Sequence, residues 1–382
     1  MRMLVLGAGL QGSACAYDLL QSDRVERVVL ADVRLDHLPE FIERYRGDTR
    51  LHLKQIDARD LNSVRSIMSG MDACMNALPY YFNLDISRVA AESGVHCCDL
   101  GGNTAIVFDQ LKLHEAALAK NVSVIPDCGL APGMVNILAE LGIMRLDQTD
   151  SVKLFVGGLP QDPQPPLNYQ IVYSLEGVLD YYTTPSWVVR DGEPKQVEAL
   201  SEIEMVRFDD PVGTLEAFHT AGGLSTMAWR YKGKIGTMEY KTLRYPGHAE
   251  IMRAVRGLGL LDLAPTTVKG QTIVPRDVFI TCAEPKLRKP QGKDMVALRV
   301  VVEGKKDSKP KQIAFDLIDR YDQKNGISAM ERTTGYSLSI TGQIQADRKV
   351  KSGVFTPDQA MPGELYIAEL AKRGIEIHQR EY

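Results

Sequence analysis

The sequence predicts an α/β protein with a doubly wound parallel sheet, followed by a second α+β domain with a mixed or antiparallel sheet. Three observations predict this. A glycine-rich turn follows the first apolar run, and apolar runs then alternate with helical periodicity to about residue 127. After Pro132-Gly133 the rhythm changes to longer strand-like runs with fewer helices. We therefore expect a first domain over 1–130, a second over 131–333, and a segment 334–382 that packs back on the first.

The elements of the first domain follow from the position of each apolar run and its spacing. Expected strands lie at 3–6, 26–31, 51–56, 71–78, 95–100 and 122–126. Expected helices lie at 12–21, 36–46, 61–69, 84–93 and 108–120. Strands and helices in strict alternation predict parallel strands joined by crossover helices, with helices on both faces of the sheet.

The glycine turn has the form that binds a dinucleotide. Gly7-Ala8-Gly9-Leu10-Gln11-Gly12 lies between a strand and a helix, and Asp32 ends the next strand 20 residues after Gly12. Such glycines let the backbone approach a pyrophosphate at a helix N-terminus, as in a Rossmann-type domain. An acid in the position of Asp32 binds the ribose and disfavours a 2′-phosphate, so NAD is the expected cofactor, although Arg34 is nearby. The predicted cofactor contacts are Gly7, Gly9, Leu10, Gln11, Gly12, Asp32, Asp57, Asn76, Ala77 and Leu78.

The second half of the chain predicts a different mixture of elements. Expected strands lie at 153–156, 186–190, 202–208, 237–245, 295–303, 312–321 and 327–332, with a hairpin turn at Asp191-Gly192. Expected helices lie at 134–144, 174–182, 247–259, 275–284, 334–347 and 363–373.

Composition excludes several classes of protein. Over 382 residues the net charge is −4, which offers no electrostatic footprint for nucleic acid. The six cysteines show no CxxC spacing and the histidines do not cluster, so neither a metal site nor a disulfide framework is expected. No apolar run is long enough for a membrane span. We expect a soluble cytoplasmic protein that has a small-molecule substrate and binds neither nucleic acid nor membrane.

Two aspartates end strands at the edge where doubly wound sheets bind ligands. Asp99 follows the fifth expected strand and Asp127 the sixth, each beside small residues that let a ligand come close. Both are candidate catalytic acids or bases. The alternative is that they cap turns or helices, which is equally common for aspartate.

Polar residues also gather in two segments of the second domain. His219 and Thr220 precede two glycines, which suits a loop over a small ligand, although a buried structural histidine is an equal alternative. In residues 239–248, period-2 geometry places Glu239 and Lys241 on one face of a strand and Tyr240 and Arg244 on the other. Lys241 is then either a base or half of an ion pair with Glu239. At the end of this strand, Arg244 and His248 are the preferred substrate contacts.

Five motifs together resemble the saccharopine dehydrogenase superfamily, and most closely its compact lysine 6-dehydrogenase branch. They are Leu6-Gly7-Ala8-Gly9-Leu10, the run 127–134 (DCGLAPGM), the run 174–177 (SLEG), the run 216–220 (EAFHT) and the run 239–248 (EYKTLRYPGH). The resemblance implies an NAD-dependent enzyme that removes the ε-amine of L-lysine oxidatively. It gives a semialdehyde, which cyclises, and ammonia. The resemblance also implies a homodimer.

Hydride removal from an amine requires that its nitrogen first loses a proton, and a lysine amine has a pKa of about 10.4. The predicted catalytic residues are His219, Lys241, Asp127 and Asp99. The predicted substrate contacts are Arg244, His248, Tyr240 and Thr220. Two other functions remain open: a reductase or dehydrogenase of the saccharopine or carboxynorspermidine type, and a non-enzymatic NAD-responsive regulator on the same fold.

Overall fold

The computed structural model describes residues 1–172, 174–289 and 291–382. Its first sheet has seven strands in the order β17-β6-β5-β4-β1-β2-β3, and every pairing in it is parallel. The strands are β1 (Arg2–Leu6), β2 (Arg27–Asp32), β3 (Leu51–Gln55), β4 (Ala73–Asn76), β5 (His96–Asp99), β6 (Ser123–Ile125) and β17 (Gly353–Val354). This confirms the predicted doubly wound sheet, to which the C-terminal part of the chain adds the short edge strand β17.

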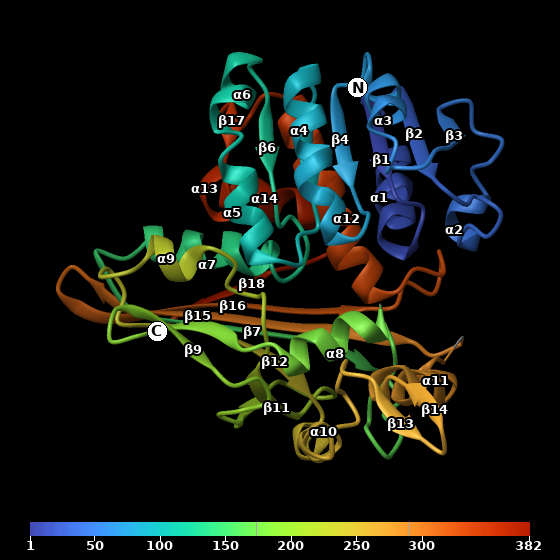
Figure 1. Cartoon of the computed structure of the whole chain (residues 1–382). Helices are drawn as coiled ribbons and strands as arrows, with labels where there is room; N and C mark the ends of the chain where they lie inside the picture. Colours follow the sequence, from blue (N-terminus) through green and yellow to red (C-terminus); the bar gives the residue numbers. More distant parts are fainter. Residues whose placement is uncertain (173, 290) are drawn as a thin grey trace.

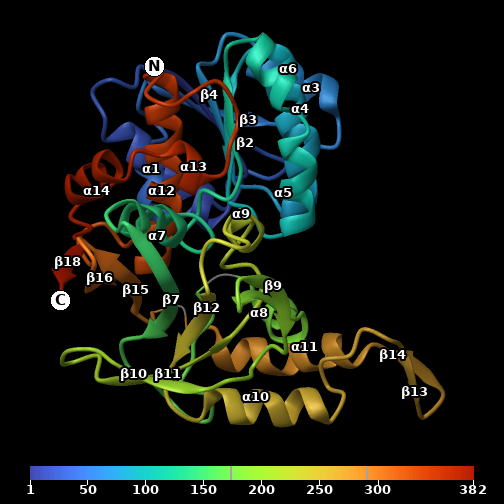
Figure 2. The ribbon, with the colours of Figure 1, turned by 90° about the vertical axis from the view of Figure 1, so that its left-hand side faces the viewer.

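Helices cover both faces of this sheet, as Figure 2 shows. The helices of the first part of the chain are α1 (Leu10–Leu20), α2 (Glu40–Glu43), α3 (Leu61–Met68), α4 (Asn83–Ser93), α5 (Thr104–Leu111) and α6 (His114–Ala119), with a 3₁₀ turn η1 (Tyr80–Phe82). One face carries α3, α4, α5 and α6, and the other carries α1. The helix expected over 108–120 is in fact two helices, and the one expected over 36–46 is a single turn.

The second sheet is mixed and has nine strands (Figure 1). Its strands are β7 (Gln148–Pro160), β8 (Ser186–Arg190), β9 (Glu193–Val197), β10 (Glu204–Arg207), β11 (Thr214–His219), β12 (Thr237–Arg244), β15 (Asp294–Lys306), β16 (Lys309–Arg320) and β18 (His378–Glu381). The main path runs β10-β11-β12-β7-β15-β16-β18, and β12 pairs with β7 in parallel while its other pairings are antiparallel. The hairpin expected at Asp191-Gly192 joins β8 and β9.

The remaining helices belong to the second part of the chain. They are α7 (Met134–Met144), α8 (Leu175–Thr183), α9 (Met227–Arg230), α10 (His248–Gly257), α11 (Pro275–Leu287), α12 (Ala329–Ala346), α13 (Pro357–Ala360) and α14 (Gly363–Ala371). A small hairpin of β13 (Thr266–Val268) and β14 (Gln271–Ile273) extends away from the second sheet (Figure 2). No helix among the described residues is long and apolar enough to cross a membrane.

The strand expected at 327–332 is wrong, because α12 begins there. The Ser328 hydroxyl accepts the Glu331 amide at 3.0 Å, and the Glu331 carboxylate accepts the Ser328 amide at 2.7 Å. This capping box is a helix start that outweighs the local apolar pattern. From there α12 packs on α1 and on the strands β4 and β5, while β18 at the end of the chain pairs with β16 of the second sheet.

Candidate functional site

A cavity of about 600 Å³ lies where the carboxyl ends of the parallel strands meet the second sheet. The loops after β4, β5 and β6 form one side of it, and β7, β12, α8 and α12 form the other. Its size is in the range that holds a small ligand beside part of a cofactor. This is the edge at which the sequence predicted ligand binding.

The glycine loop has the shape that a pyrophosphate requires. A Cβ on Gly12 would lie 1.8 Å from the Gly7 carbonyl oxygen, so the loop closes only with glycine there. Around the Cβ position of Gly9, by contrast, no atom of the described residues lies within 4 Å. The start of α1, where Leu10 is 45% exposed, therefore faces open space into which the phosphates fit. Gln11 extends from this turn into the cavity lining, and its buried Oε1 accepts no hydrogen bond from the described residues.

The two acids predicted to contact the cofactor differ in their surroundings. Asp32 ends β2 and is held against the glycine loop, because its carboxylate accepts the Ala8 amide at 2.7 Å and the Arg34 amide at 3.0 Å. Asp57 follows β3 and pairs with Arg59, whose hydrogen bonds lower the Asp57 pKa to about 2. Asp32 thus lies beside the loop, whereas the carboxylate of Asp57 already has a cationic partner.

Asn76 and Asp99 belong to one buried hydrogen-bond network. Asn76 donates to Asn83 at 2.9 Å, Asn83 donates to Asp99 at 2.9 Å, and Gln110 donates to Asp99 at 2.6 Å. The Gly101 amide adds a fourth bond, to Asp99 at 2.7 Å. Burial raises the pKa of Asp99 to about 6. With these donors in place, Asp99 holds the loops that line the cavity, while the neighbouring Ala77 and Leu78 line it directly.

Asp127 lies directly beneath the glycines at the cavity wall. A Cβ on Gly101 would lie 1.8 Å from Asp127 Oδ1, so a glycine is needed at this close approach. Oδ2 accepts the Ser225 hydroxyl, whereas Oδ1 accepts no hydrogen bond of good geometry. Burial, with a contribution from the charge of Asp99, raises the pKa of Asp127 to about 7. Of the two strand-end aspartates, Asp127 has an oxygen available for a further proton.

The strand β12 separates two environments, as its predicted alternation implies. Tyr240 and Arg244 line the cavity, together with Thr242, which the sequence reasoning missed. Thr220 lies behind Thr242, and their hydroxyl oxygens are 2.7 Å apart. Lys241 points to the other face, where it donates to Glu204 at 2.6 Å and to the Glu202 carbonyl at 2.7 Å. The expected pairing of Lys241 with Glu239 is therefore replaced by pairing with Glu204.

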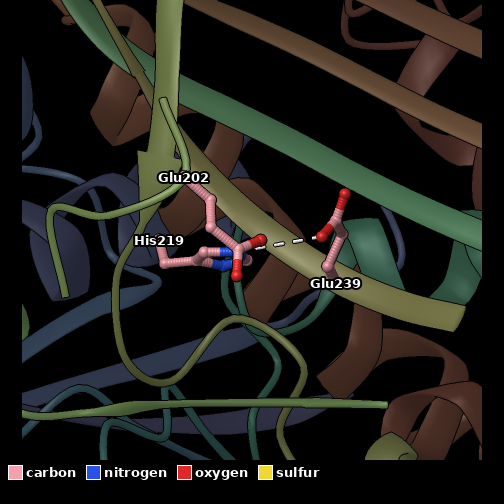
Figure 3. A group of neighbouring side chains, drawn as sticks. All are labelled: Glu202, His219 and Glu239. Atoms are coloured by element: carbon pink, nitrogen blue, oxygen red, sulfur yellow. Dashed lines mark hydrogen bonds and ion pairs between the residues drawn. The ribbon is translucent and has the colours of Figure 1, made fainter. Parts of the chain in front are cut away.

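His219 lies on this second face, in a cluster with Glu202 and Glu239 (Figure 3). It ends β11, where a loop was expected, and its Nε2 is 3.1 Å from a Glu202 oxygen. One potential ligand atom from each of the three residues lies within 4.8 Å of the others, which is a metal-like spacing. Arg190, however, donates to Glu239 at 2.5 Å and to Glu202 at 2.8 Å. A guanidinium already occupies the position that a cation would take. His219 and Lys241 do not line the cavity.

Arg244 lines the cavity and is held there by contacts with buried residues. It is 4% exposed, its Nε donates to the Tyr182 hydroxyl at 3.2 Å, and its guanidinium lies 4.9 Å from the Tyr169 ring centre. His248 is behind it, with Nε2 2.9 Å from the Tyr182 hydroxyl and Nδ1 3.1 Å from the Leu167 carbonyl.

Burial and the charge of Arg244 lower the pKa of His248 to about 3, so the ring is neutral near pH 7. A carbonyl only accepts, so Nδ1 carries the proton and donates to Leu167. The Tyr182 hydroxyl then donates to Nε2 and accepts from Arg244. The expectation that His248 touches the substrate is therefore wrong for this cavity: the histidine orients Tyr182, which orients Arg244.

Residues 3–125 match the family model of the saccharopine dehydrogenase NADP binding domain, and residues 129–375 match that of the saccharopine dehydrogenase C-terminal domain. The chain belongs to the saccharopine dehydrogenase family. The superfamily predicted from the motifs and the dinucleotide-binding domain are thereby confirmed. The lysine 6-dehydrogenase branch stays a prediction.

Similar proteins of known sequence share part of this chain. It is 24% identical over 273 residues to the mitochondrial alpha-aminoadipic semialdehyde synthase of Bos taurus, which covers 68% of this chain and 28% of that protein. It is 22% identical over 223 residues to the saccharopine dehydrogenase [NADP(+), L-glutamate-forming] of Saccharomyces cerevisiae, covering 54% of this chain and 47% of that protein. The chain thus spans less than half the length of these relatives.

Solved structures share the whole fold. The apo saccharopine dehydrogenase (L-Glu forming) from Saccharomyces cerevisiae superposes with a TM-score of 0.81 at 19% identity, covering 100% of this chain and 99% of the other. The homospermidine synthase from Legionella pneumophila, solved in complex with NAD, has a TM-score of 0.71 at 12% identity, covering 100% and 91%.

Proposed function

We propose that the chain is an NAD-dependent amine dehydrogenase that oxidises the ε-amine of L-lysine and releases ammonia. The observation that carries the proposal is the cavity itself. It joins the loops at the carboxyl ends of the nucleotide-binding strands to a buried guanidinium, Arg244, on β12. A substrate with a carboxylate at one end and a reacting carbon at the other fits this arrangement, because it is held at both ends.

We assign a residue to each proposed step. Arg244 binds the α-carboxylate, because a planar guanidinium can make two parallel hydrogen bonds to it. Asp127, whose Oδ1 lies against Gly101 of the cavity wall, accepts the proton that the ε-ammonium must lose, since a base whose pKa is about 7 is suited to neutral pH. When bound, the dinucleotide supplies the hydride acceptor. Water then adds to the imine carbon and ammonia leaves.

The choice of NAD over NADP rests on Asp32. Its carboxylate is fixed beside the glycine loop by the amides of Ala8 and Arg34, where it favours a ribose hydroxyl over a phosphate. The exposed Arg34 next to it is the group that could hold a 2′-phosphate instead. Steady-state kinetics with both cofactors test this part of the proposal, and equal use of NADP would contradict it.

The reaction is tested by following NADH production with lysine, ornithine, cadaverine and saccharopine while ammonia is measured in parallel. The proposal predicts NADH and ammonia in equal amounts from lysine, with a cyclic imine as the carbon product. NADH without ammonia, or no NADH from any free amine, would contradict it.

A second candidate is cleavage of saccharopine, or its reductive formation, and the names of the similar proteins favour it. In that reaction water adds to an imine between two amino acids, and glutamate leaves instead of ammonia. The same screen separates the two functions, because NADH production from saccharopine with release of glutamate supports only the second.

A further inference from the structure

Helix α8 forms one wall of the cavity and brings acidic side chains to it. Its N-cap Ser174 and its residues Glu176, Gly177, Asp180 and Tyr181 all line the cavity. Glu176 and Asp180 are four residues apart, so they lie on the same face of the helix. The same helix carries Tyr182, whose hydroxyl accepts a hydrogen bond from Arg244. The acidic wall and the guanidinium are therefore parts of one assembly.

Three charged side chains are present among the described residues that line the cavity. Among its described residues Arg244 is the only cationic side chain, and Glu176 and Asp180 are the acidic ones. Asp180 is paired with Arg276, which is 3% exposed. Glu176 makes no hydrogen bond or ion pair with another described residue. Glu176 is therefore the one carboxylate of this described lining that has no ion pair, and it is available to a cationic ligand.

Aromatic side chains at the same place favour a cation as well. Tyr80, Tyr81, Tyr181 and Tyr240 all line the cavity, and the faces of aromatic rings attract ammonium groups. Behind Gly101 of the lining is Asp127, which is 2% exposed. Its Oδ1 accepts no well-aligned hydrogen bond from the described residues. Four rings and several carboxylates around one guanidinium suit a ligand with more than one amine.

We infer that Glu176 binds a second cationic group of the substrate, the α-ammonium of an amino acid whose carboxylate is on Arg244. This inference rests on the proposed function and names the feature of the substrate that the site recognises. A guanidinium alone accepts any carboxylate. Arg244 and Glu176 together recognise a zwitterion, and they disfavour ligands with a second carboxylate in this part of the cavity.

Equilibrium binding tests this without relying on turnover. Isothermal titration of the protein saturated with NADH, at pH 8, compares L-lysine with 6-aminohexanoate, which lacks the α-ammonium group. In the NADH complex no hydride can leave the amine, so the dissociation constant is measured directly. The variant is Glu176→Gln. The control is Glu250→Gln, since Glu250 is likewise an exposed acid in the first turn of a helix but is not part of the lining of this cavity.

The expected result is that Glu176→Gln weakens lysine binding about tenfold and 6-aminohexanoate binding less than about twofold. Glu250→Gln leaves both unchanged. Equal losses for the two ligands, no loss for lysine, or no binding of either ligand to the wild-type complex would overturn the inference. If the selective loss appears although lysine is never oxidised, the inference stands and the proposed reaction fails.

Discussion

The two faces of β12 both carry polar and charged residues, but their surroundings differ. One face turns Tyr240, Thr242 and Arg244 into the cavity. The other turns Glu239 and Lys241 into a closed network with Arg190 and Glu204. Both faces are buried and charged. What differs is the kind of group that surrounds each charge and whether a cavity lies beside it.

This difference separates residues that maintain the fold from residues available to a ligand. On the network face, each charge of Lys241 and Glu239 has an opposite charge within 2.6 Å. On the cavity face, the partners of Arg244 include the Tyr182 hydroxyl, a backbone carbonyl and the Tyr169 ring, and Arg244 also lines the cavity. Because Arg244 lies in the wall of a cavity, we propose that a ligand carboxylate binds there. We therefore assign the proposed site to the cavity face, although the network face has the larger number of ionisable groups.

The largest effect is expected at Asp127, on the cavity side. Asp127→Asn removes the proposed base, so kcat/KM with lysine should fall about 100-fold or more at pH 8. The variant should still show a cooperative thermal unfolding transition, which is the control for folding. A variant with full activity would contradict the assignment of the base and move it to another group.

The pH dependence of kcat/KM in the wild type and in Asp127→Asn sharpens this prediction. With Asp127 as base, kcat/KM rises as the pH increases through about 7, and Asp127→Asn lacks this rise.

The raised pKa of Asp127 also affects stability, because the folded protein favours the protonated form of this carboxyl more than the unfolded chain does. The stability from this group is therefore present below pH 4 and lost as the pH increases to about 7. The free energy of unfolding of the variant should gain on that of the wild type over this interval.

On the network face the prediction is reversed. Lys241→Met removes the donor to Glu204 and to a backbone carbonyl, and losing charged hydrogen bonds of this kind costs about 2 kcal/mol of unfolding free energy. Chemical denaturation should show this loss, while kcat/KM of the folded variant stays within about twofold. A stable Lys241→Met protein without activity would contradict this account, because the chemistry would then depend on the network face.

A smaller effect is expected where a neutral group orients Arg244. Tyr182→Phe removes the acceptor of the Arg244 Nε hydrogen bond and the donor to His248, worth about 1 kcal/mol. The KM for lysine should rise about fivefold, while the KM for cadaverine, which has no carboxylate, stays the same. An equal rise for both amines would mean that Tyr182 supports the cavity in general rather than the guanidinium.

The sequence predicted the parts of this site that depend on local patterns. The glycine turn with Asp32 is a contiguous signal, and the alternation along 239–245 by itself predicts that Arg244 and Lys241 lie on opposite faces of the strand. His219 and His248 were not placed correctly, because their partners come from residues distant in sequence: Glu202 for one, Tyr182 and Leu167 for the other.

The acidic wall was missed for a related reason. The run 174–177 contributed to the family resemblance, but which face of α8 meets the cavity depends on how the helix packs beside β12. Period-3.6 reasoning shows that Glu176 and Asp180 share a face, without showing what that face meets. A sequence signal did exist: Glu176 is an acid in the first turn of a helix whose apolar residues are buried. In the structure those apolar residues pack against Phe218 and Leu200.

The most direct test of the cavity face as the site of chemistry is kcat/KM for lysine and for cadaverine, in the wild type and in Arg244→Ala. If Arg244 binds the α-carboxylate, the variant loses about 2–4 kcal/mol of transition-state stabilisation with lysine, which is about 30-fold to 1,000-fold in kcat/KM. With cadaverine it loses little. Equal losses with the two amines would contradict this account, because Arg244 would then support the fold or the cofactor and not the substrate.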